Sequence, residues 1–399
     1  MSDHVPEDLY GKLGVSSGKE DVHSALRGTK IEELFPGSFC KVVSDISKDP
    51  DYAIIQHQDG AGSKVLQAYI HYKETGDADW FRGLVYDTIA MNLDDILCVG
   101  ITEPAVFTDT IDRNPKTIPG EVIAVLIDEF NKACKRLNEQ GVEILFGGGE
   151  TADLGDQVAT LTLNGTITVR FKRSDAITGQ KIKEGDVIVG LASGGKANYE
   201  DKLNSGISSN GLTLARHALM SKEYAERYPE TVESSKLKED VAYFGPYKFD
   251  DKTEGLEMTV GEAILSPTRT YAPVVKKILN VHRADVHGMV HNTGGGQTKC
   301  LHLGNNIHYI KDNLFEPDTI FSLIQKSANE SWENMFKTFN CGSRLDIICD
   351  KNSADSIIGI AETFNVKARQ IGRCERSDTG NKLTVKSKFG EFSYGKKEI

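Results

Sequence analysis

The sequence has no long hydrophobic run, no closely spaced cysteine pair and no dense stripe of basic residues. No segment reaches the apolar length that spans a bilayer, so we expect no membrane association. The seven cysteines form no C-x-x-C pair, which argues against a zinc site or a disulfide framework. A formal net charge of −11 without clustered Lys and Arg argues against a nucleic-acid partner.

Several common catalytic and nucleotide-binding motifs are also missing. No G-x-G-x-x-G stands at the end of a predicted strand, H-E-x-x-H does not occur, and the G-x-S-x-G at residues 14–18 follows no predicted strand. Residues 190–197 come close to the P-loop pattern G-x-x-x-x-G-K-[ST], but Ala197 lacks the hydroxyl group that would bind magnesium. These absences argue against a Rossmann dehydrogenase, a protein kinase, a metalloprotease and a serine hydrolase.

The composition and length are typical of a soluble protein of two domains. The chain has 399 residues, of which 39% are hydrophobic and 26% charged, and this length supports two cores. A new apolar run begins at residue 186, so we predict an N-terminal domain at 1–180 and a C-terminal domain at 181–399, with a polar excursion at about 221–255. The first eight residues are acidic and lack a secretory signal, so we expect a cytoplasmic location.

Hydrophobic periodicity predicts an α/β fold with some antiparallel character. Residues 158–171 alternate between apolar and polar, with Asn164-Gly165 placed as in a tight type I′ turn, so we predict a hairpin there. Apolar residues recur at helical spacing in two other segments, and two short apolar runs are typical of strands. We therefore predict helices at 83–97 and 119–141 and strands at 104–109 and 142–146.

Two glycine-rich segments follow predicted strands in the first half. Residues 59–64, Asp-Gly-Ala-Gly-Ser-Lys, combine glycines that admit phosphate oxygens with a carboxylate and an ammonium group, although a surface turn can have the same composition. Residues 147–151 form the second segment. Carboxylates near a phosphate site need a cation, and magnesium is the usual one. The six carboxylates expected near these segments are Asp59, Asp87, Asp94, Asp95, Asp109 and Glu150.

Read alone, the pair Asp94-Asp95 is also compatible with solvated charges at a helix end. In the second half, residues 285–290 predict a strand that leads into a triple glycine. His287 and His291 are four residues apart, so alternation would place them on one face of that strand, either in a site or as core histidines. A second anionic ligand is therefore expected in this half.

Seven motifs in order along the chain carry a resemblance to a known family. They are D-G-A-G-S-K (59–64), D-T-I-A-M-N-L-D-D (87–95), G-G-G-E-T-A (147–152), S-S-N-G (208–211), S-P-T-R-T-Y (266–271), D-V-H-G-M-V-H-N-T-G-G-G (285–296) and T-F-N-C-G (338–342). Together they resemble the phosphoribosylformylglycinamidine cyclo-ligases, also called aminoimidazole ribonucleotide synthetases, of purine biosynthesis. The resemblance extends from about residue 10 to about residue 375.

The resemblance implies an α/β fold of the α+β type, the two-domain ATP-binding synthetase fold. In it, the N-terminal domains of a homodimer contribute strands to a shared β-barrel, and the C-terminal domain is an α/β layer. It also implies ATP and Mg²⁺ as cofactors and a small nucleotide substrate, formylglycinamidine ribonucleotide. The formyl oxygen would attack the γ-phosphate and the amidine nitrogen would close the ring, which gives aminoimidazole ribonucleotide, ADP and phosphate.

Carrying the motifs over residue by residue gives the expected site. The catalytic candidates are Lys64, His291 and His287. The metal ligands would be Asp59, Asp87, Asp95 and Glu150. The ATP-binding residues would be Asp59, Gly60, Gly62, Lys64, Asp87, Asp95, Gly148, Gly149, Glu150 and Thr151. The substrate-binding residues would be Asn210, Gly211, Arg269, Thr293, Gly294, Gly295, Gly296 and Asn340.

The chain departs from the family's pattern at two places, of which residues 95–104 are one residue longer than the family's stretch. The family typically has a histidine two residues before the Asn-Gly of the loop at 208–211, where this chain has Ser208. If that histidine assists proton transfer, His291 or His287 would have to do so here. Two alternatives therefore stay open: another ATP-dependent synthetase or kinase of the same superfamily, and a catalytically silent nucleotide-binding relative.

Overall fold

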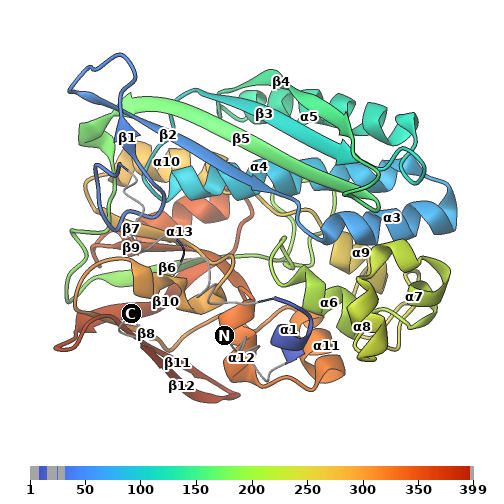
Figure 1. Cartoon of the computed structure of the whole chain (residues 1–399). Coiled ribbons are helices and arrows are strands. Elements are labelled where there is room, and N and C mark those ends of the chain that lie inside the picture. The colour runs from blue at the N-terminus through green and yellow to red at the C-terminus, as the bar shows by residue number, and fades with distance from the viewer. Residues whose placement is uncertain (1–8, 16–24, 26–31, 396–399) are drawn as a thin grey trace.

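The computed structural model describes residues 9–15, 25 and 32–395, which form two β-sheets with helices packed between and beside them (Figure 1). Sheet A has the strand order β1-β2-β5-β3-β4. β5 is antiparallel to both of its neighbours, whereas β3 and β4 run parallel. The strands of sheet A are β1 (Val43–Ser44), β2 (Tyr52–Gly60), β3 (Ala105–Arg113), β4 (Ile144–Asp153) and β5 (Leu161–Lys172).

One face of sheet A is covered by helices. α4 and α5 pack against each other and against the strands, and α3 contacts β5. Side chains along β3 and β5 alternate between buried and more exposed positions, as expected for a sheet with one covered face. The predicted helices at 83–97 and 119–141 are confirmed, as are the strands at 104–109 and 142–146. The helices of this half are α3 (Lys64–Thr75), the 3₁₀ helix η1 (Ala78–Phe81), α4 (Arg82–Leu97) and α5 (Gly120–Glu139).

Sheet B has the strand order β12-β11-β8-β10-β6-β9-β7. Its neighbouring strands are antiparallel except for β8 and β11. β6, β7 and β9 are buried along their whole length; β6 is apolar throughout, whereas β7 and β9 also bury His291, Arg344 and Asp346. The strands are β6 (Val187–Ala192), β7 (Val286–His291), β8 (Ile307–Lys311), β9 (Ser343–Cys349), β10 (Ala368–Arg376), β11 (Lys382–Ser387) and β12 (Gly390–Gly395).

The remaining helices join the two sheets into one body. α10 contacts both α4 and α13, and α6, α9 and α11 pack together and reach α3 (Figure 1). Within the described residues, no helix combines the length and apolarity needed to cross a membrane. These helices are α1 (Leu9–Lys12), α6 (Leu212–Leu219), α7 (Glu223–Arg227), α8 (Ser234–Lys238), α9 (Val260–Leu265), α10 (Ala272–His282), α11 (Thr319–Ala328), α12 (Trp332–Thr338) and α13 (Ala354–Thr363), with 3₁₀ turns η2 (Arg173–Asp175), η3 (Pro229–Thr231) and η4 (Gly296–His302).

Two local predictions are wrong. The hairpin turn at Asn164-Gly165 does not form, because β5 runs straight through both residues. A side-chain carbon on Gly165 would lie 2.3 Å from the ring of Phe107, so this glycine serves close packing rather than a turn. The second glycine-rich segment, 147–151, lies inside β4 instead of in a loop. The predicted excursion at 221–255 holds α7, η3 and α8, and its Tyr224 and Tyr243 side chains are buried.

The imidazole ring of His71 is buried in α3 among aromatic side chains. Its ring packs edge-on against Trp80 and Phe249, with centroid distances of 4.4 and 4.9 Å. Neither of its ring nitrogens forms a hydrogen bond within the described residues. Burial lowers the pKa of His71 to about 3, because the imidazolium cation would have no solvation there.

We expect His71→Leu to make the protein less sensitive to acid. An unfolded histidine binds a proton below about pH 6.5, whereas His71 in the folded protein does so only near its pKa of about 3. As the pH falls below about 6.5, the unfolded chain gains a proton that the folded protein does not bind. The free energy of unfolding therefore falls, by about 2 kcal/mol at about pH 5. Urea unfolding at about pH 8 and about pH 5 measures the loss. An equal loss in variant and wild type would contradict this assignment.

Candidate functional site

The candidate site is organised by helix α4, whose polar residues are buried and take partners from distant parts of the chain. Asp87, Asn92, Asp94 and Asp95 are each at most 8% exposed. The alternative that Asp94 and Asp95 are solvated charges at a helix end is therefore wrong. Buried carboxylates require ion pairs or hydrogen bonds, so the partners of these residues define what the site contains.

Asp87 forms a buried ion pair with Lys64, the first residue of α3. Lys64 Nζ donates to Asp87 Oδ1 and to the Ser266 carbonyl, both at 2.7 Å. Asp87 Oδ1 also accepts from Ser209 Oγ at 2.9 Å and from the Thr268 backbone N–H at 2.8 Å. Burial lowers the pKa of Lys64, against the attraction of Asp87. The lysine predicted to contact phosphate is thus fully buried and joins the first glycine-rich loop to the second half of the chain.

Asp95 is held between two histidines. His291 Nδ1 lies 2.7 Å from Asp95 Oδ1, and His57 Nε2 lies 3.3 Å from Asp95 Oδ2. Burial acts to raise the pKa of Asp95, but the charge of Lys299 and these two hydrogen bonds outweigh it and hold the pKa well below its ordinary value. Asp95 is therefore an anion whose two oxygens are both occupied.

The surroundings also determine the protonation of His57. Asn92 Nδ2 donates to the carbonyl groups of Asp59 and Thr88, so its Oδ1 faces His57 Nδ1, 3.0 Å away. His57 Nδ1 must therefore carry a proton, while Nε2 faces the Asp95 carboxylate. Burial opposes the charged form of His57, but the hydrogen bond to Asp95 outweighs it and raises the pKa.

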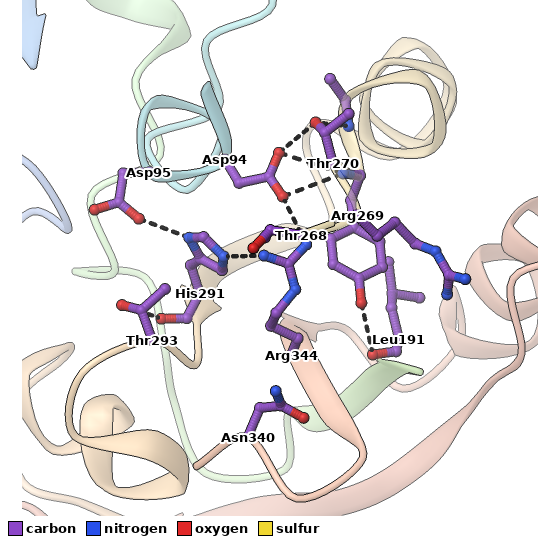
Figure 2. A network of polar contacts seen from close by, with 12 residues as sticks. Asp94, Asp95, Leu191, Thr268, Arg269, Thr270, His291, Thr293, Asn340 and Arg344 are labelled. Atoms are coloured by element: carbon purple, nitrogen blue, oxygen red, sulfur yellow. Dashed lines mark hydrogen bonds and ion pairs between the residues drawn. The ribbon is translucent and has the colours of Figure 1, made fainter. Parts of the chain in front are cut away.

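His291 connects Asp95 to Asp94 through Arg344 (Figure 2). Arg344 Nη1 donates to His291 Nε2 at 2.8 Å, so the imidazole donates to Asp95 from Nδ1. Arg344 Nη2 lies 3.4 Å from Asp94 Oδ2. Burial lowers the pKa of His291 to about 4 and raises that of Asp94 to about 7. Both ring nitrogens of His291 are hydrogen-bonded, which leaves neither free to act as a general base.

Arg269 holds a loop of the second half. Its Nε and Nη2 donate to the Glu200 carboxylate at 2.9 and 2.6 Å. Nη1 donates to the carbonyl groups of Ala192 and Gly194, each at 3.0 Å, and Nη2 donates to that of Gly195 at 2.9 Å. A guanidinium group has five N–H donors, and all five are used here. Arg269 therefore has no donor left for the substrate role that the motif predicts.

The other predicted substrate residues form loops that lie side by side. A side-chain carbon built on Gly294 would lie 3.6 Å from Asn210 Nδ2, and Asn210 Oδ1 is buried without a partner among the described residues. Asn340 Nδ2 donates to the Gly206 carbonyl and its Oδ1 accepts from the Gly342 N–H, each at 2.9 Å. The same loops contain Gly211, Thr293, Gly295 and Gly296.

The first glycine-rich loop reaches this region from sheet A. A side-chain carbon on Gly62 would lie 3.9 Å from the Ser209 carbonyl. Asp59, at the end of β2, accepts a hydrogen bond from the Gly60 N–H through Oδ1 at 2.7 Å. Burial raises the pKa of Asp59, and the hydrogen bond from Gly60 opposes this effect. The loops that carry the motifs of both halves thus meet at one place.

Two sets of predicted site residues lie apart from this network. Strands β5 and β3 separate β2 from the edge strand β4. β4 carries the predicted ATP-binding residues Gly148, Gly149, Glu150 and Thr151. His287 Nδ1 lies 2.8 Å from Asp186 Oδ2, and within the described part of the chain no hydrogen bond joins it to Asp95 or His291. The structure does not bring the two histidines to a common partner.

The four predicted metal ligands do not form a complete protein site. In the described ranges, no group of three or more His, Cys, Asp or Glu side chains is arranged to hold a metal ion. Asp95 does not fit the role, because imidazoles occupy both of its oxygens. Asp59 fits better, because its Oδ2 accepts no hydrogen bond from any described residue. Asp87 Oδ2 is buried and also lacks a partner there. Magnesium is usually held by one or two carboxylates together with substrate phosphates, so Asp59 and Asp87 fit an ion that arrives with ATP.

Sequence reasoning missed several members of the network. His57 lies two residues before Asp59 and on the same side of β2, so strand alternation was a usable signal. Asn92 lies on α4 between the carboxylates that were identified. Lys299 follows the triple glycine by three residues. Arg344 has no local signal, since its role depends on contacts with β7 and α4.

Comparison with known families gives the same two-part organisation. The family model described as AIR synthase related protein, N-terminal domain, matches residues 39–170, and the corresponding C-terminal domain model matches residues 183–382. The fold and site therefore define a two-domain synthetase of the AIR synthase related class.

Curated relatives narrow this class. The chain is 34% identical over 341 residues to the phosphoribosylformylglycinamidine cyclo-ligase of Methanocaldococcus jannaschii. This match covers 84% of this chain and 83% of the relative. It is 30% identical to the enzyme of the same name from Methanococcus maripaludis strain C6, over 96% of this chain and 97% of that one. The chain belongs to the phosphoribosylformylglycinamidine cyclo-ligase family.

Solved structures with low sequence identity share the fold. T. maritima PurL complexed with FGAR has a TM-score of 0.54 at 13% identity; the match covers 95% of this chain and 49% of PurL, so this chain spans about half the length of PurL. AaThiL complexed with AMPPCP and TMP has a TM-score of 0.52 at 13% identity and covers 94% of this chain and 96% of its own.

We expect Lys64→Met to destabilise the protein by about 3–5 kcal/mol, because it leaves the Asp87 carboxylate buried without its cation. The matched control is Lys222→Met, since Lys222 pairs with Asp240 at the exposed surface and such pairs contribute little. Urea unfolding measures both variants. If Lys64→Met costs no more than the control, the buried ion pair does not have the role assigned to it.

Proposed function

We propose that this protein is an ATP-dependent ligase that closes the imidazole ring of formylglycinamidine ribonucleotide and releases aminoimidazole ribonucleotide, ADP and phosphate. The observation that supports this most directly is the meeting of motif-bearing loops from both halves. Gly62 approaches Ser209, Lys64 binds the Ser266 carbonyl, and Asn210 lies beside Gly294. Membership of the cyclo-ligase family supports the choice of reaction over other ATP-dependent chemistry.

In the proposed reaction, the formyl oxygen attacks the γ-phosphorus of ATP and ADP leaves. The amidine nitrogen then attacks the formyl carbon, and the carbon–oxygen bond breaks as phosphate departs with the former formyl oxygen. This chemistry depends mainly on positioning and charge stabilisation. His291, with both nitrogens hydrogen-bonded to Asp95 and Arg344, is a positioning residue in this scheme rather than a proton carrier.

We propose that magnesium binds together with ATP and that Asp59 supplies a carboxylate oxygen to it. Asp87 has one further oxygen without a protein partner among the described residues. A bound magnesium ion would offset the charge of the transferred phosphate. We place the reaction in the cytoplasm, because all seven cysteines are buried and free, as is typical of proteins from a reducing compartment.

We propose a homodimer that forms through the uncovered face of sheet A. Val106 and Leu145 are paired neighbours on β3 and β4, and they are 42% and 67% exposed. Beside them the uncharged side chains of Thr166 and Thr168 lie at the half-exposed positions of β5. β4 is also an edge strand. Exposed apolar side chains on an open sheet next to an unpaired edge favour association with another chain.

The activity is tested by measuring phosphate release from ATP and Mg²⁺ with and without formylglycinamidine ribonucleotide. We expect release that depends on the ribonucleotide. Asp59→Asn should lower kcat about 100-fold, because it removes a charge that acts on the transferred phosphate. Asp240→Asn is the control, since Asp240 is exposed and pairs with Lys222 outside the network. Bound ATP without ribonucleotide-dependent release would overturn the proposal and favour a catalytically silent relative.

The dimer is tested by sedimentation velocity of Leu145→Lys. A charge at this position should convert a dimer into monomers, because the proposed interface buries the side chain and cannot solvate an ammonium group. Leu237→Lys is the matched control, since Leu237 is 42% exposed on α8 and lies outside sheet A. A dimer that withstands Leu145→Lys would contradict the proposed interface.

A further inference from the structure

Lys299 is a cation in the network that the proposed reaction does not use. It lies in η4, three residues after Gly296. Its Nζ donates to Thr293 Oγ1, and it makes no other hydrogen bond or ion pair within the described residues. An ammonium group has three N–H donors, so two of them have no protein acceptor there.

The surroundings hold this ammonium group near the carboxylates without neutralising it. Lys299 Nζ lies 4.9 Å from the centre of the Phe39 ring, a favourable cation–π contact. Its charge helps to hold the pKa of Asp95 low against the effect of burial. The oxygens of Asp95 are nevertheless taken by His291 and His57, and no other carboxylate of the described residues pairs with the ammonium group.

The loop that precedes η4 presents further donors beside Lys299. The backbone N–H groups of Gly294 and Gly295 donate no hydrogen bond within the described part of the chain, and Gly294 is exposed. Gly295 has φ 93°, a conformation that glycine adopts without strain. The Thr293 hydroxyl group is already used, since it accepts from Lys299 and donates to the His291 carbonyl at 3.4 Å. Unused backbone amides beside an ammonium group form a donor set typical of phosphate sites.

The other basic side chains of the network are already committed. Lys64 is fully buried against Asp87. Arg344 is bonded to His291 and paired with Asp94. Arg269 uses all five of its donors within the protein. Among the described Lys and Arg residues of this network, Lys299 is thus the one whose N–H donors remain available to a ligand.

We propose that Lys299 is the charge partner of a substrate phosphoryl group that binds at residues 293–295. This inference rests on the proposed function, because both of its substrates carry such a group: the phosphate monoester of the ribonucleotide and the polyphosphate of ATP. The bond formed is non-covalent. Lys299 acts by binding and not by proton transfer.

The test compares the wild type with Lys299→Met and Lys299→Arg by measuring the KM values for the ribonucleotide and for ATP. Lys299→Met should raise the KM for the substrate whose phosphoryl group it binds about 10- to 100-fold, with a much smaller change in kcat. Lys299→Arg should restore most of the loss. A rise for the ribonucleotide alone assigns its monoester, and a rise for ATP alone assigns the polyphosphate.

A matched control is Lys388→Met, because Lys388 also lies over an aromatic ring, 5.1 Å from the centre of Phe389, but in the turn between β11 and β12. It should leave both KM values unchanged. Unchanged KM values for Lys299→Met, or a shifted pH profile of kcat with normal KM values, would overturn the proposal in favour of a purely electrostatic role beside Asp95.

A binding measurement separates this inference from the proposed function. If the wild type shows no ribonucleotide-dependent turnover, the proposed function fails, but calorimetric titration with inorganic pyrophosphate still tests Lys299. Binding to Lys299→Met about 10-fold or more weaker than to the wild type supports the phosphoryl site. Equal binding of pyrophosphate by the variant and the wild type overturns it.

Discussion

The arrangement of this molecule depends on the charges buried along helix α4. Asp87, Asp94 and Asp95 lie inside the protein, and an unpaired carboxylate there would cost several kcal/mol. Their partners come from elements far away in the sequence, with Lys64 on α3, Arg344 on β9 and histidines on β2 and β7. The buried carboxylates of α4 can therefore reach all of these partners only when the two sheets are in one relative arrangement. That arrangement brings the motif-bearing loops together.

The same network suggests how the work of the site is divided. Lys64, Arg269 and Arg344 are basic residues that a motif or a general expectation would assign to phosphate, yet each is committed to the protein. They hold the loops in place. The ligand is left with the backbone amides of Gly294 and Gly295 and with Lys299. A site of this kind stabilises charge and positions reactants, which is what phosphoryl transfer to an amide oxygen requires.

Much of the fold could be predicted from the sequence, because the spacing of apolar residues in a long amphipathic segment indicates both its secondary structure and its buried face. Helices α4 and α5 and strands β3, β6 and β7 follow from periodicity and apolar runs. The Asn164-Gly165 hairpin failed because the local turn signal is weaker than the packing of Phe107 against Gly165. The order of strands within each sheet depends on contacts that no local pattern encodes.

The same limit applies to the site: local motifs could be predicted, whereas contacts between distant residues could not. Glycines and carboxylates in local motifs were found, as Asp59, Asp95 and the loop at 293–296 illustrate. Whether a motif residue faces a ligand or the protein depends on distant partners, which is why Arg269 and Lys64 were assigned to substrate and phosphate. Arg344 acts through a contact across 250 positions and Lys299 through the fold of a loop, so no local pattern identifies them, whereas His57 could have been found from the alternation of β2.

In the proposed reaction, ATP activates the formyl oxygen of the ribonucleotide for ring closure, and this step sets the order of bond breaking. It is tested most directly by turning over formylglycinamidine ribonucleotide that carries ¹⁸O in the formyl group and analysing the released phosphate by mass spectrometry. We expect one ¹⁸O atom per turnover in inorganic phosphate, because the carbon–oxygen bond breaks when phosphate leaves. Unlabelled phosphate released together with aminoimidazole ribonucleotide would contradict it.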